Sequence, residues 1–213
     1  MYKAVIFDLD GTLLDTLDDL ANAVNYALAY YRLPQRTREE ICSFVGNGMA
    51  NLIARSAGED TPNQDKILAT FRAHYGEHCK DETKPYADIL TLLSALKERG
   101  IKTAVLSNKA DYAVQALARE YFPALLDIAQ GEDEENGIMR KPNPNGLLNI
   151  IKNLGLAPNE IVYVGDSDID IQTAKNAGTD CISVTWGFRG EAFLRESGAT
   201  VLVNSPLQIL EKI

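Results

Sequence analysis

The stretch VIFDLDGTLLDT, residues 5–16, places two acidic side chains directly after a short apolar run. The run at residues 5–7 lacks the alternation of apolar and polar residues that a half-exposed strand has, so it is typical of a strand buried on both faces. Asp8 and Asp10 follow with one leucine between them, and Gly11 comes next. A single acid after a strand is usually a turn or helix-cap residue, so the role of this pair has to be judged from the rest of the chain.

Further apolar, β-branched runs indicate that this strand belongs to a parallel sheet. The expected strands lie at residues 3–7, 103–106, 161–164, 181–184 and 200–203. Helical patterns separate them, such as the leucine and isoleucine repeats at residues 89–96 and 147–154, the second of which ends before Gly155. This alternation of strands and helices predicts an α/β fold with a doubly wound parallel sheet.

One spacing indicates an insertion into this fold. Roughly 95 residues separate the first expected strand from the second, whereas a parallel crossover needs only about a dozen. Within the gap, apolar residues recur with the period of a helix from Leu17 to Tyr31, and three further segments also look helical. We therefore expect an all-helical domain at residues 16–83, inserted into an α/β domain made of residues 1–15 and 84–213. Two connections would allow the helical domain to hinge.

Polar side chains follow three of the expected strands, namely Asp8, Ser107 and Asp166. In open α/β sheets, ligands bind outside the carboxyl ends of the strands, so these side chains are expected to converge on one site. Two carboxylates about 4 Å apart repel each other by roughly 4 kcal/mol at an effective dielectric constant near 20, and such a group needs a proton or a cation. Mg²⁺ fits, because it takes a few oxygen ligands and commonly holds a phosphate in the same coordination shell.

Two further features fit a phosphate at this site. Gly11 lets the backbone approach an anion closely, and amide groups of a tight turn can donate hydrogen bonds to phosphate oxygens. Lys141, in RKPNPNG, precedes a helix expected to begin near Pro144, and the two prolines restrict the backbone around it. Its ammonium group could bridge the acids and the substrate phosphate.

Composition excludes several other classes of function. The 213 residues are 46% hydrophobic and carry a formal net charge of -9, which would repel the phosphate backbone of nucleic acids and anionic membrane surfaces. No apolar run approaches the roughly 18 residues of a membrane span. The first expected strand begins near Met1, and the three cysteines lack CxxC spacing, so we expect a cytoplasmic protein with reduced thiols and with neither nucleic-acid nor membrane partners.

Four motifs in order carry a family resemblance: DLDGT at residues 8–12, SN at 107–108, KPNP at 141–144 and GDSDID at 165–170. With them the sequence resembles the haloacid dehalogenase superfamily of phosphohydrolases, and within it the phosphoglycolate phosphatase group. The resemblance covers essentially the whole chain. It implies a Rossmann-like core with a helical cap inserted after the first strand, a Mg²⁺ cofactor and a small phosphorylated substrate, first of all 2-phosphoglycolate. Either a monomer or a homodimer is compatible with it.

The resemblance also implies a role for each motif residue. Asp8 would be the nucleophile and a metal ligand, and Asp10 would be the general acid and base and would give its backbone carbonyl to the metal. Asp166 would be a further metal ligand, supported by Asp170 from behind. Ser107 and Lys141 would hold the phosphoryl group that is transferred through an aspartyl-phosphate intermediate. The substrate-binding residues would include Leu9, Gly11, Thr12, Asn108 and, in the cap loop VGNGM, Gly46 and Gly48.

Other reactions of this superfamily fit the residues less well. Dehalogenases lack an acid two residues after the nucleophile, because no alkoxide needs a proton, so Asp10 argues against that chemistry. Sugar phosphomutases usually have a histidine shortly after the DT pair, where this chain has Leu20. Pyrophosphate, nucleoside monophosphates and sugar phosphates stay open as alternative substrates. A phosphoacceptor signalling module without turnover is an alternative from another class, but such modules are shorter and have no helical insertion.

Several features are ambiguous in the sequence. The segment PYADI at residues 85–89 departs from the Pro-Gly pair common in the family, which bears on hinge stiffness and substrate choice. Gly46 and Gly48 could equally form a plain helix–helix turn. His74 and His78 stand four residues apart and are expected to be a solvated or packing pair rather than a metal site. Lys109 either attracts anionic substrates or is an ordinary surface lysine.

Overall fold

The computed structural model describes residues 2–213 and divides the chain into two compact units. The first unit comprises residues 1–14 and 85–213, and the second comprises residues 15–84. A two-stranded sheet of β2 (Leu14–Asp15) and β3 (Lys84–Pro85) carries the two connections between them. Because β2 and β3 are paired with each other, the two connections between the units run side by side.

A parallel sheet of six strands forms the centre of the first unit, in the order β5-β4-β1-β6-β7-β8. Its strands are β1 (Ala4–Phe7), β4 (Lys102–Ala110), β5 (Ile128–Glu132), β6 (Ile161–Gly165), β7 (Asp180–Val184) and β8 (Leu202–Val203). The chain proceeds from β1 to β4 and β5 on one side and returns to β6, β7 and β8 on the other. This reversal at β1 confirms the doubly wound α/β fold and makes the carboxyl end of β1 the expected position of a ligand site.

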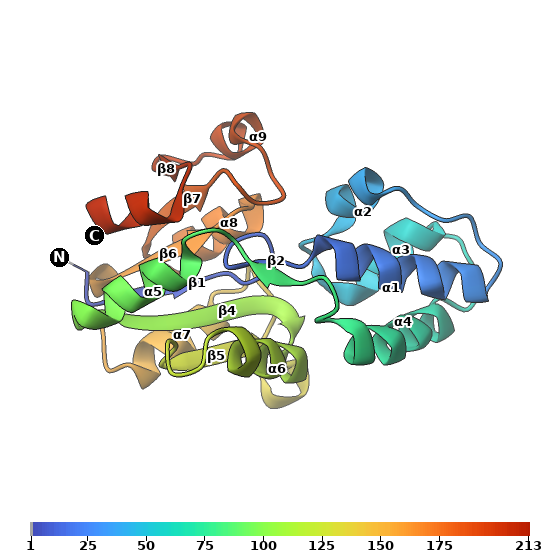
Figure 1. The fold of residues 1–213 in the computed structure, drawn as a ribbon, viewed down its shortest axis with the longest axis horizontal. Helices are drawn as coiled ribbons and strands as arrows, with labels where there is room; N and C mark the ends of the chain where they lie inside the picture. Colours follow the sequence, from blue (N-terminus) through green and yellow to red (C-terminus); the bar gives the residue numbers. More distant parts are fainter. Residues whose placement is uncertain (1) are drawn as a thin grey trace. The chain divides into compact units, whose positions relative to one another are not determined.

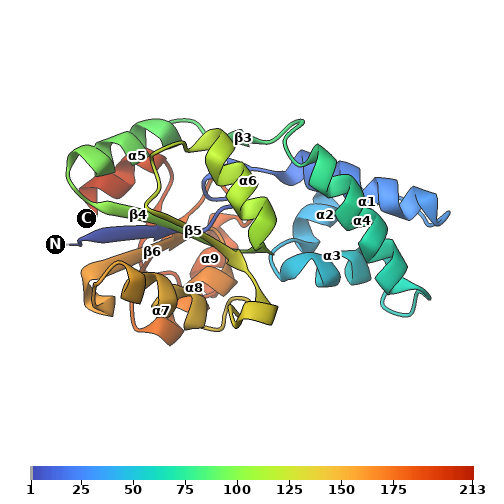
Figure 2. The ribbon, with the colours of Figure 1, turned by 90° about the horizontal axis from the view of Figure 1, so that it is seen from below.

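Helices cover both faces of this sheet. They are α5 (Ile89–Glu98), α6 (Asp111–Tyr121), α7 (Asn145–Asn153), α8 (Asp168–Ala177) and α9 (Glu191–Glu196), with short 3₁₀ turns at Glu134–Asn136, Pro158–Glu160 and Pro206–Glu211. Figure 2 shows α5 and α6 on one side of the sheet and α7 and α8 on the other. All four residues of β1 are completely buried, so the apolar run of the sequence does occupy the middle of the sheet.

Strand β5 differs from the sequence expectation, which placed no strand there. Its residues IAQGE include only two apolar side chains, and all but Gly131 are only partly buried. Because β5 is an edge strand, it pairs with β4 alone and does not need the continuous apolar run from which central strands are recognised. The expected run at residues 200–203 forms a shorter strand, β8.

The second unit is a bundle of four helices: α1 (Leu17–Tyr30), α2 (Arg38–Phe44), α3 (Gly48–Ala57) and α4 (Gln64–His78). Its core is formed by the apolar faces of these helices, with the fully buried Phe71 and Tyr75 stacked at a ring distance of 5.4 Å. The four helices are labelled in Figure 1. None of the helices formed by residues 2–213 combines the length and apolar character that crossing a bilayer requires.

Asp19 in the first turn of α1 anchors the end of the second unit. Its carboxylate is 2% exposed and accepts hydrogen bonds from the backbone N–H groups of Glu82 and Thr83, both at 2.9 Å. An ionised acceptor makes such bonds about twice as strong as neutral ones. Asp19 therefore holds the segment that leads back to β3.

We predict that Asp19→Ala lowers the free energy of unfolding by about 2 kcal/mol, because two backbone N–H groups, of which that of Thr83 is buried, lose their acceptor. Urea denaturation followed by circular dichroism measures this difference. Asp18→Ala is the matched control: Asp18 is half exposed in its ion pair with Arg38, and such surface pairs contribute less than about 1 kcal/mol. Equal losses for the two variants would contradict the anchoring role of Asp19.

Candidate active site

The register of the sheet brings three sequence motifs to one edge. Phe7 is paired with Val105 on β4 and with Val164 on β6. Asp8 directly follows Phe7, and Ser107 and Asp166 come two residues after its partners, so the three side chains lie near one edge of the sheet. Ser107 was expected to follow its strand, but β4 continues past it to Ala110, so it lies within the strand. All three are less than 10% exposed.

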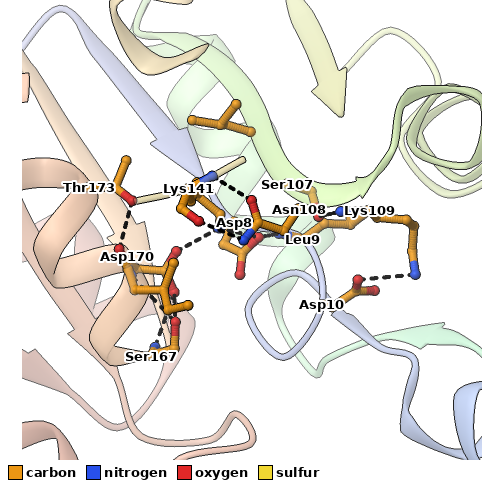
Figure 3. A network of polar contacts seen from close by, with 12 residues as sticks. Asp8, Leu9, Asp10, Ser107, Asn108, Lys109, Lys141, Ser167, Asp170 and Thr173 are labelled. Carbon is orange, nitrogen blue, oxygen red and sulfur yellow. Dashed lines mark hydrogen bonds and ion pairs between the residues drawn. The ribbon is translucent and has the colours of Figure 1, made fainter. Parts of the chain in front are cut away.

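Lys141 lies among the acidic groups of this edge. Its Nζ is 2.8 Å from Asp8 Oδ1 and 2.7 Å from Asp170 Oδ1, and it donates a hydrogen bond to the hydroxyl of Tyr163 at 3.1 Å. The side chain is 3% exposed. Figure 3 shows this ammonium group between the two carboxylates, which it links.

Asn108 fixes the backbone from which Lys141 extends. Its side-chain oxygen accepts a bond from Lys141 N–H at 2.6 Å, and its side-chain nitrogen donates to Lys141 C=O at 3.1 Å. These two bonds join the end of β4 to the loop before α7. Asn108 was expected to contribute to substrate binding, and in the structure its side chain positions Lys141.

Asp170 is held on its other side by the start of α8. Its Oδ2 accepts hydrogen bonds from Ser167 N–H at 3.1 Å and from Ser167 Oγ–H at 2.6 Å, and Ser167 Oγ accepts from Asp170 N–H. This is a capping box that satisfies the first N–H groups of the helix. Gly165 has to be a glycine, because a Cβ there would come within 3.0 Å of the Asp170 carboxylate. Asp170 therefore has one fixed position, with Oδ1 turned towards Lys141.

Asp166 is enclosed by backbone rather than by side chains. Its Oδ2 accepts a hydrogen bond from Phe188 N–H at 2.6 Å. A Cβ on Gly11 or on Gly187 would come within 3.0 Å of the carboxylate. The loop after β7 is in turn fixed to the DLDGT turn, because Trp186 Nε1–H donates to Thr12 C=O at 3.0 Å. Gly11 lies at φ +84°, a conformation that favours glycine.

The pKa values of these groups are shifted by burial and by the charges of their neighbours. Burial raises the pKa of Asp8 to about 7, although Lys141 acts in the opposite direction. Burial and the charges of Asp170 and Asp8 also raise the pKa of Asp166 well above its usual value. Burial would lower the pKa of Lys141, but the carboxylates of Asp170 and Asp8 outweigh it and keep the lysine charged.

The acidic residues form a group that fits a hard cation. One carboxylate oxygen from each of Asp8, Asp166 and Asp170 lies within 4.8 Å of the other two. Among residues 2–213, these three side chains form the group that could hold a metal ion. Three carboxylates face one lysine in this group, so a divalent ion would relieve the repulsion between them when they are ionised. Oxygen-only ligands are those that hard divalent cations prefer.

Asp10 lies beside this group and pairs with a different cation. Its Oδ2 is 3.0 Å from Nζ of Lys109, whose side chain is only 2% exposed, so Lys109 is not a surface lysine. Asp10 Oδ1 and Thr12 Oγ1 are buried without a hydrogen-bond partner within residues 2–213. Leu9 N–H donates to Asp8 Oδ1 at 2.7 Å, so this amide holds the carboxylate of its neighbour.

Two expected binding residues lie in the other unit. Gly46 lies in the short turn between α2 and α3 and Gly48 is the first residue of α3, with φ values of +120° and +82°. A turn with such backbone angles requires residues without a side chain, whichever further role it has. His74 stacks on Tyr26 at a ring distance of 3.9 Å and is followed by His78, which pairs with Asp81, so the histidines contribute to the packing of the bundle.

Three contributions were not anticipated from the sequence. Tyr163 lies in an apolar strand, and nothing in the sequence around it indicates that its hydroxyl accepts a hydrogen bond from Lys141. The backbone N–H of Phe188 and the glycine at 187 have no side-chain signature at all. Only the turn-forming sequence TWGFRG after β7 signals that this loop has a constrained shape.

Comparisons with known proteins agree with this geometry. Residues 5–184 match the haloacid dehalogenase-like hydrolase family. The chain belongs to this family. The match spans the whole core up to the end of β7, including all four motifs and the helical unit.

The chain is similar along its length to individual members of the haloacid dehalogenase-like family. It is 33% identical to the phosphoglycolate phosphatase of Haemophilus influenzae, covering 98% of this chain and 97% of the relative. A protein from Lactobacillus delbrueckii subsp. bulgaricus with a solved structure is 39% identical, with a TM-score of 0.94 over 100% and 98% of the two chains. A predicted phosphoglycolate phosphatase from Haemophilus somnus is 29% identical, with a TM-score of 0.90 over 99% and 97%. The membership and the fold expected from the motifs are thus confirmed.

We predict that Gly187→Ala weakens divalent-cation binding by roughly 10- to 100-fold, the usual effect of disturbing a group that orients a metal ligand. The added methyl group would meet Asp166 and the carbonyl of Gly11, so the carboxylate has to move. Calorimetric titration with Mg²⁺ or Mn²⁺ measures the affinity directly.

Gly190→Ala is the control in the same loop. A Cβ at Gly190 has no atom within 4 Å, and its φ of -75° suits any residue. This variant should bind cations as the wild type does. Unchanged affinity in Gly187→Ala would contradict the orienting role of the loop.

Proposed function

We propose that this chain is a Mg²⁺-dependent phosphatase that hydrolyses small phosphomonoesters, first of all 2-phosphoglycolate, through an aspartyl phosphate on Asp8. The observation that carries the proposal is the position of Asp8. Its carboxylate lies at the end of the central strand, 2.8 Å from the ammonium group of Lys141 and within 4.8 Å of two further carboxylates. A nucleophile, a fixed cation and a metal-compatible group thus occur together.

In the first chemical step, an Asp8 oxygen forms a bond to phosphorus while the bond between phosphorus and the ester oxygen breaks. Asp10 gives a proton to the ester oxygen as it leaves. In the second step, water attacks the same phosphorus, Asp10 takes a proton from it, and the bond to Asp8 breaks to release phosphate. Asp10 regains in the second step the proton that it lost in the first.

Lys141 and Ser107 act on the oxygens that stay on phosphorus. In phosphoryl transfer, most catalysis comes from positioning and from neutralising charge on these oxygens. The raised pKa of Lys141 keeps its ammonium group charged, and Asn108 keeps its backbone in place. The backbone N–H of Asn108 would bind the same oxygens. Leu9 N–H donates to Asp8 Oδ1, and the N–H groups of Gly11 and Thr12 donate to backbone carbonyls of the turn, so these amides would act by holding the nucleophile and its turn in place.

Asp8 and Asp166, with the backbone carbonyl of Asp10, would hold the Mg²⁺ ion, and Asp170 would support them through its link to Lys141. When bound, such an ion neutralises phosphate charge and aligns the phosphoryl group with the nucleophile. The donor set of carboxylates and the excess negative charge described above support this assignment.

The choice of 2-phosphoglycolate rests on the relatives, several of which carry the name phosphoglycolate phosphatase. We propose that the helical unit is a cap that helps to select the substrate, with Gly46 and Gly48 giving its loop the freedom to close on a short molecule. The protein would act in the cytoplasm as a monomer or a homodimer.

A phosphate-release screen tests the function. Wild-type protein with Mg²⁺ is given 2-phosphoglycolate, pyrophosphate, nucleoside monophosphates and sugar phosphates, and kcat/KM is compared. The highest value is expected for 2-phosphoglycolate. A tenfold preference for a hexose phosphate would overturn the substrate, and the absence of turnover with every compound would overturn the activity.

We predict that Asp8→Asn lowers kcat below about one thousandth of the wild-type value, because the amide cannot form the covalent intermediate. The fold should persist, since the two side chains have the same shape. Asp168→Asn, an exposed residue in the GDSDID motif, is the control and should keep full activity. Substantial Mg²⁺-dependent turnover by Asp8→Asn would refute the nucleophile assignment.

We predict that Mg²⁺ affinity rises as the pH increases through about 7. Both Asp8 and Asp166 have a raised pKa, and each has to lose its proton before it can bind a cation. Below this range the dissociation constant should increase by up to about tenfold per pH unit for each proton displaced. Calorimetry between pH 5.5 and 8.5, repeated at each pH in two buffers of different ionisation enthalpy, counts the protons released. Affinity that is independent of pH, without proton release, would contradict the prediction.

A further inference from the structure

Lys109 is a buried charge beside the group proposed to protonate the leaving oxygen. Its side chain is 2% exposed and its Nζ lies 3.0 Å from Asp10 Oδ2. Lysine is almost never buried without a charged partner, and its ammonium group has three N–H donors, which allows it to bind more than one acceptor.

The two lysines of the site serve different acids. Lys141 contacts Asp8 and Asp170, whereas Lys109 contacts Asp10. In Figure 3, Asp170 and Asp10 lie on opposite sides of Asp8, and Lys109 reaches Asp10 from the end of β4. The positive charge of Lys109 is therefore on the side of Asp10, the residue proposed to protonate the leaving group, and away from Asp170.

An irregularity at the end of β4 aims Lys109 at this position. The pairing of β4 with β5 shifts register between Leu106 and Ala110. Lys109 N–H donates to Ser107 Oγ at 3.2 Å, and the shifted segment is secured where Asp111 Oδ1 accepts from Gly131 N–H at 2.9 Å. A Cβ on Gly131 would come within 3.0 Å of the carbonyl oxygen of Lys109. Such irregularities commonly redirect a side chain next to an active site.

The distances suit a short acidic leaving group. If Asp10 is within hydrogen-bond reach of the ester oxygen, the ammonium group of Lys109 lies on the order of 6 Å from that oxygen. In a leaving group with a carboxylate one carbon away from the ester oxygen, the ester oxygen and an ammonium group hydrogen-bonded to that carboxylate are also about 6 Å apart. A neutral leaving group of the same length would leave the ammonium group with no new acceptor.

We propose that Lys109 binds a carboxylate of the leaving group, so that the site prefers phosphomonoesters of 2-hydroxy acids over phosphomonoesters of neutral alcohols. The inference rests on the proposed function and assigns the leaving-group end of that site. Lys109 distinguishes substrates by their charge, whereas Lys141 acts on the phosphoryl group that all of them share.

Binding of two inert ligands tests this without any turnover. 3-Phosphonopropionate replaces the ester oxygen of phosphoglycolate with a methylene group, and propylphosphonate in addition replaces the carboxylate with a methyl group. Calorimetry in the presence of Mg²⁺ should give wild-type protein a roughly 10- to 100-fold preference for the carboxylate-bearing ligand, as expected for one charged hydrogen bond. Equal affinities would overturn the proposal.

Variants then assign the preference to Lys109. Lys109→Met should weaken binding of 3-phosphonopropionate by roughly 10- to 100-fold and leave the affinity for propylphosphonate within about threefold. Lys109→Arg, which keeps the charge, should retain at least part of the preference. Lys175→Met, which removes an exposed lysine of α8, should leave the affinity for both ligands unchanged. Equal weakening of both ligands by Lys109→Met would mean that the lysine only supports Asp10, and would overturn the proposal.

The same variants separate this inference from the proposed function. With turnover, Lys109→Met should lose selectivity for 2-phosphoglycolate over ethyl phosphate, seen as a change in the ratio of their kcat/KM values. If the wild type hydrolyses neither compound, the proposed function fails, and the calorimetric comparison still decides whether Lys109 recognises a carboxylate.

Discussion

The whole site depends on one buried ammonium group that lies between carboxylates. Lys141 is within 2.8 Å of both Asp8 and Asp170, and without it these acids would take up protons or move apart. Removing one partner from a buried ion pair commonly costs about 3–5 kcal/mol, because the remaining charge is left without compensation. The protein fixes this lysine through its backbone, where Asn108 holds both the N–H and the C=O. The end of β4 thereby sets the electrostatics at the end of β1.

A second constraint is space. Asp8, Asp166 and Asp170 can come within 4.8 Å of one another only because backbone without side chains surrounds them. Gly165 leaves room for Asp170, while Gly11 and Gly187 enclose Asp166. Three carboxylates face one lysine there, so their charge exceeds what Lys141 neutralises when all three are ionised. A site of this kind is arranged for a cation and for an anionic substrate that brings further charge, and it gains little as a purely structural feature.

The sequence predicted those parts of the molecule that repeat a simple pattern. Strands β1, β4, β6 and β7 were recognisable because both of their faces are buried, and the acids after them converge because parallel strands end at one edge. Strand β5 was missed because its position at the edge requires no apolar run. Lys109 was ambiguous, since no periodicity reveals that a register shift turns a lysine inwards. Tyr163 and the amide of Phe188 act through geometry that exists only in the folded chain.

The division between the two lysines has a consequence for how such a site changes its substrate. Lys141 contacts Asp8, Asp170 and Tyr163, and Asn108 holds its backbone, so any change at Lys141 disturbs Asp8, the proposed nucleophile. Lys109 contacts Asp10 from a segment outside the regular pairing of β4 and β5. A substitution at residue 109 can therefore alter which leaving group is accepted while the phosphoryl end keeps its geometry. In this proposal, Lys141 binds the phosphoryl end of the substrate and Lys109 binds the leaving group. Lys141 is fixed by contacts in the centre of the sheet, and Lys109 is positioned by the register shift between β4 and β5.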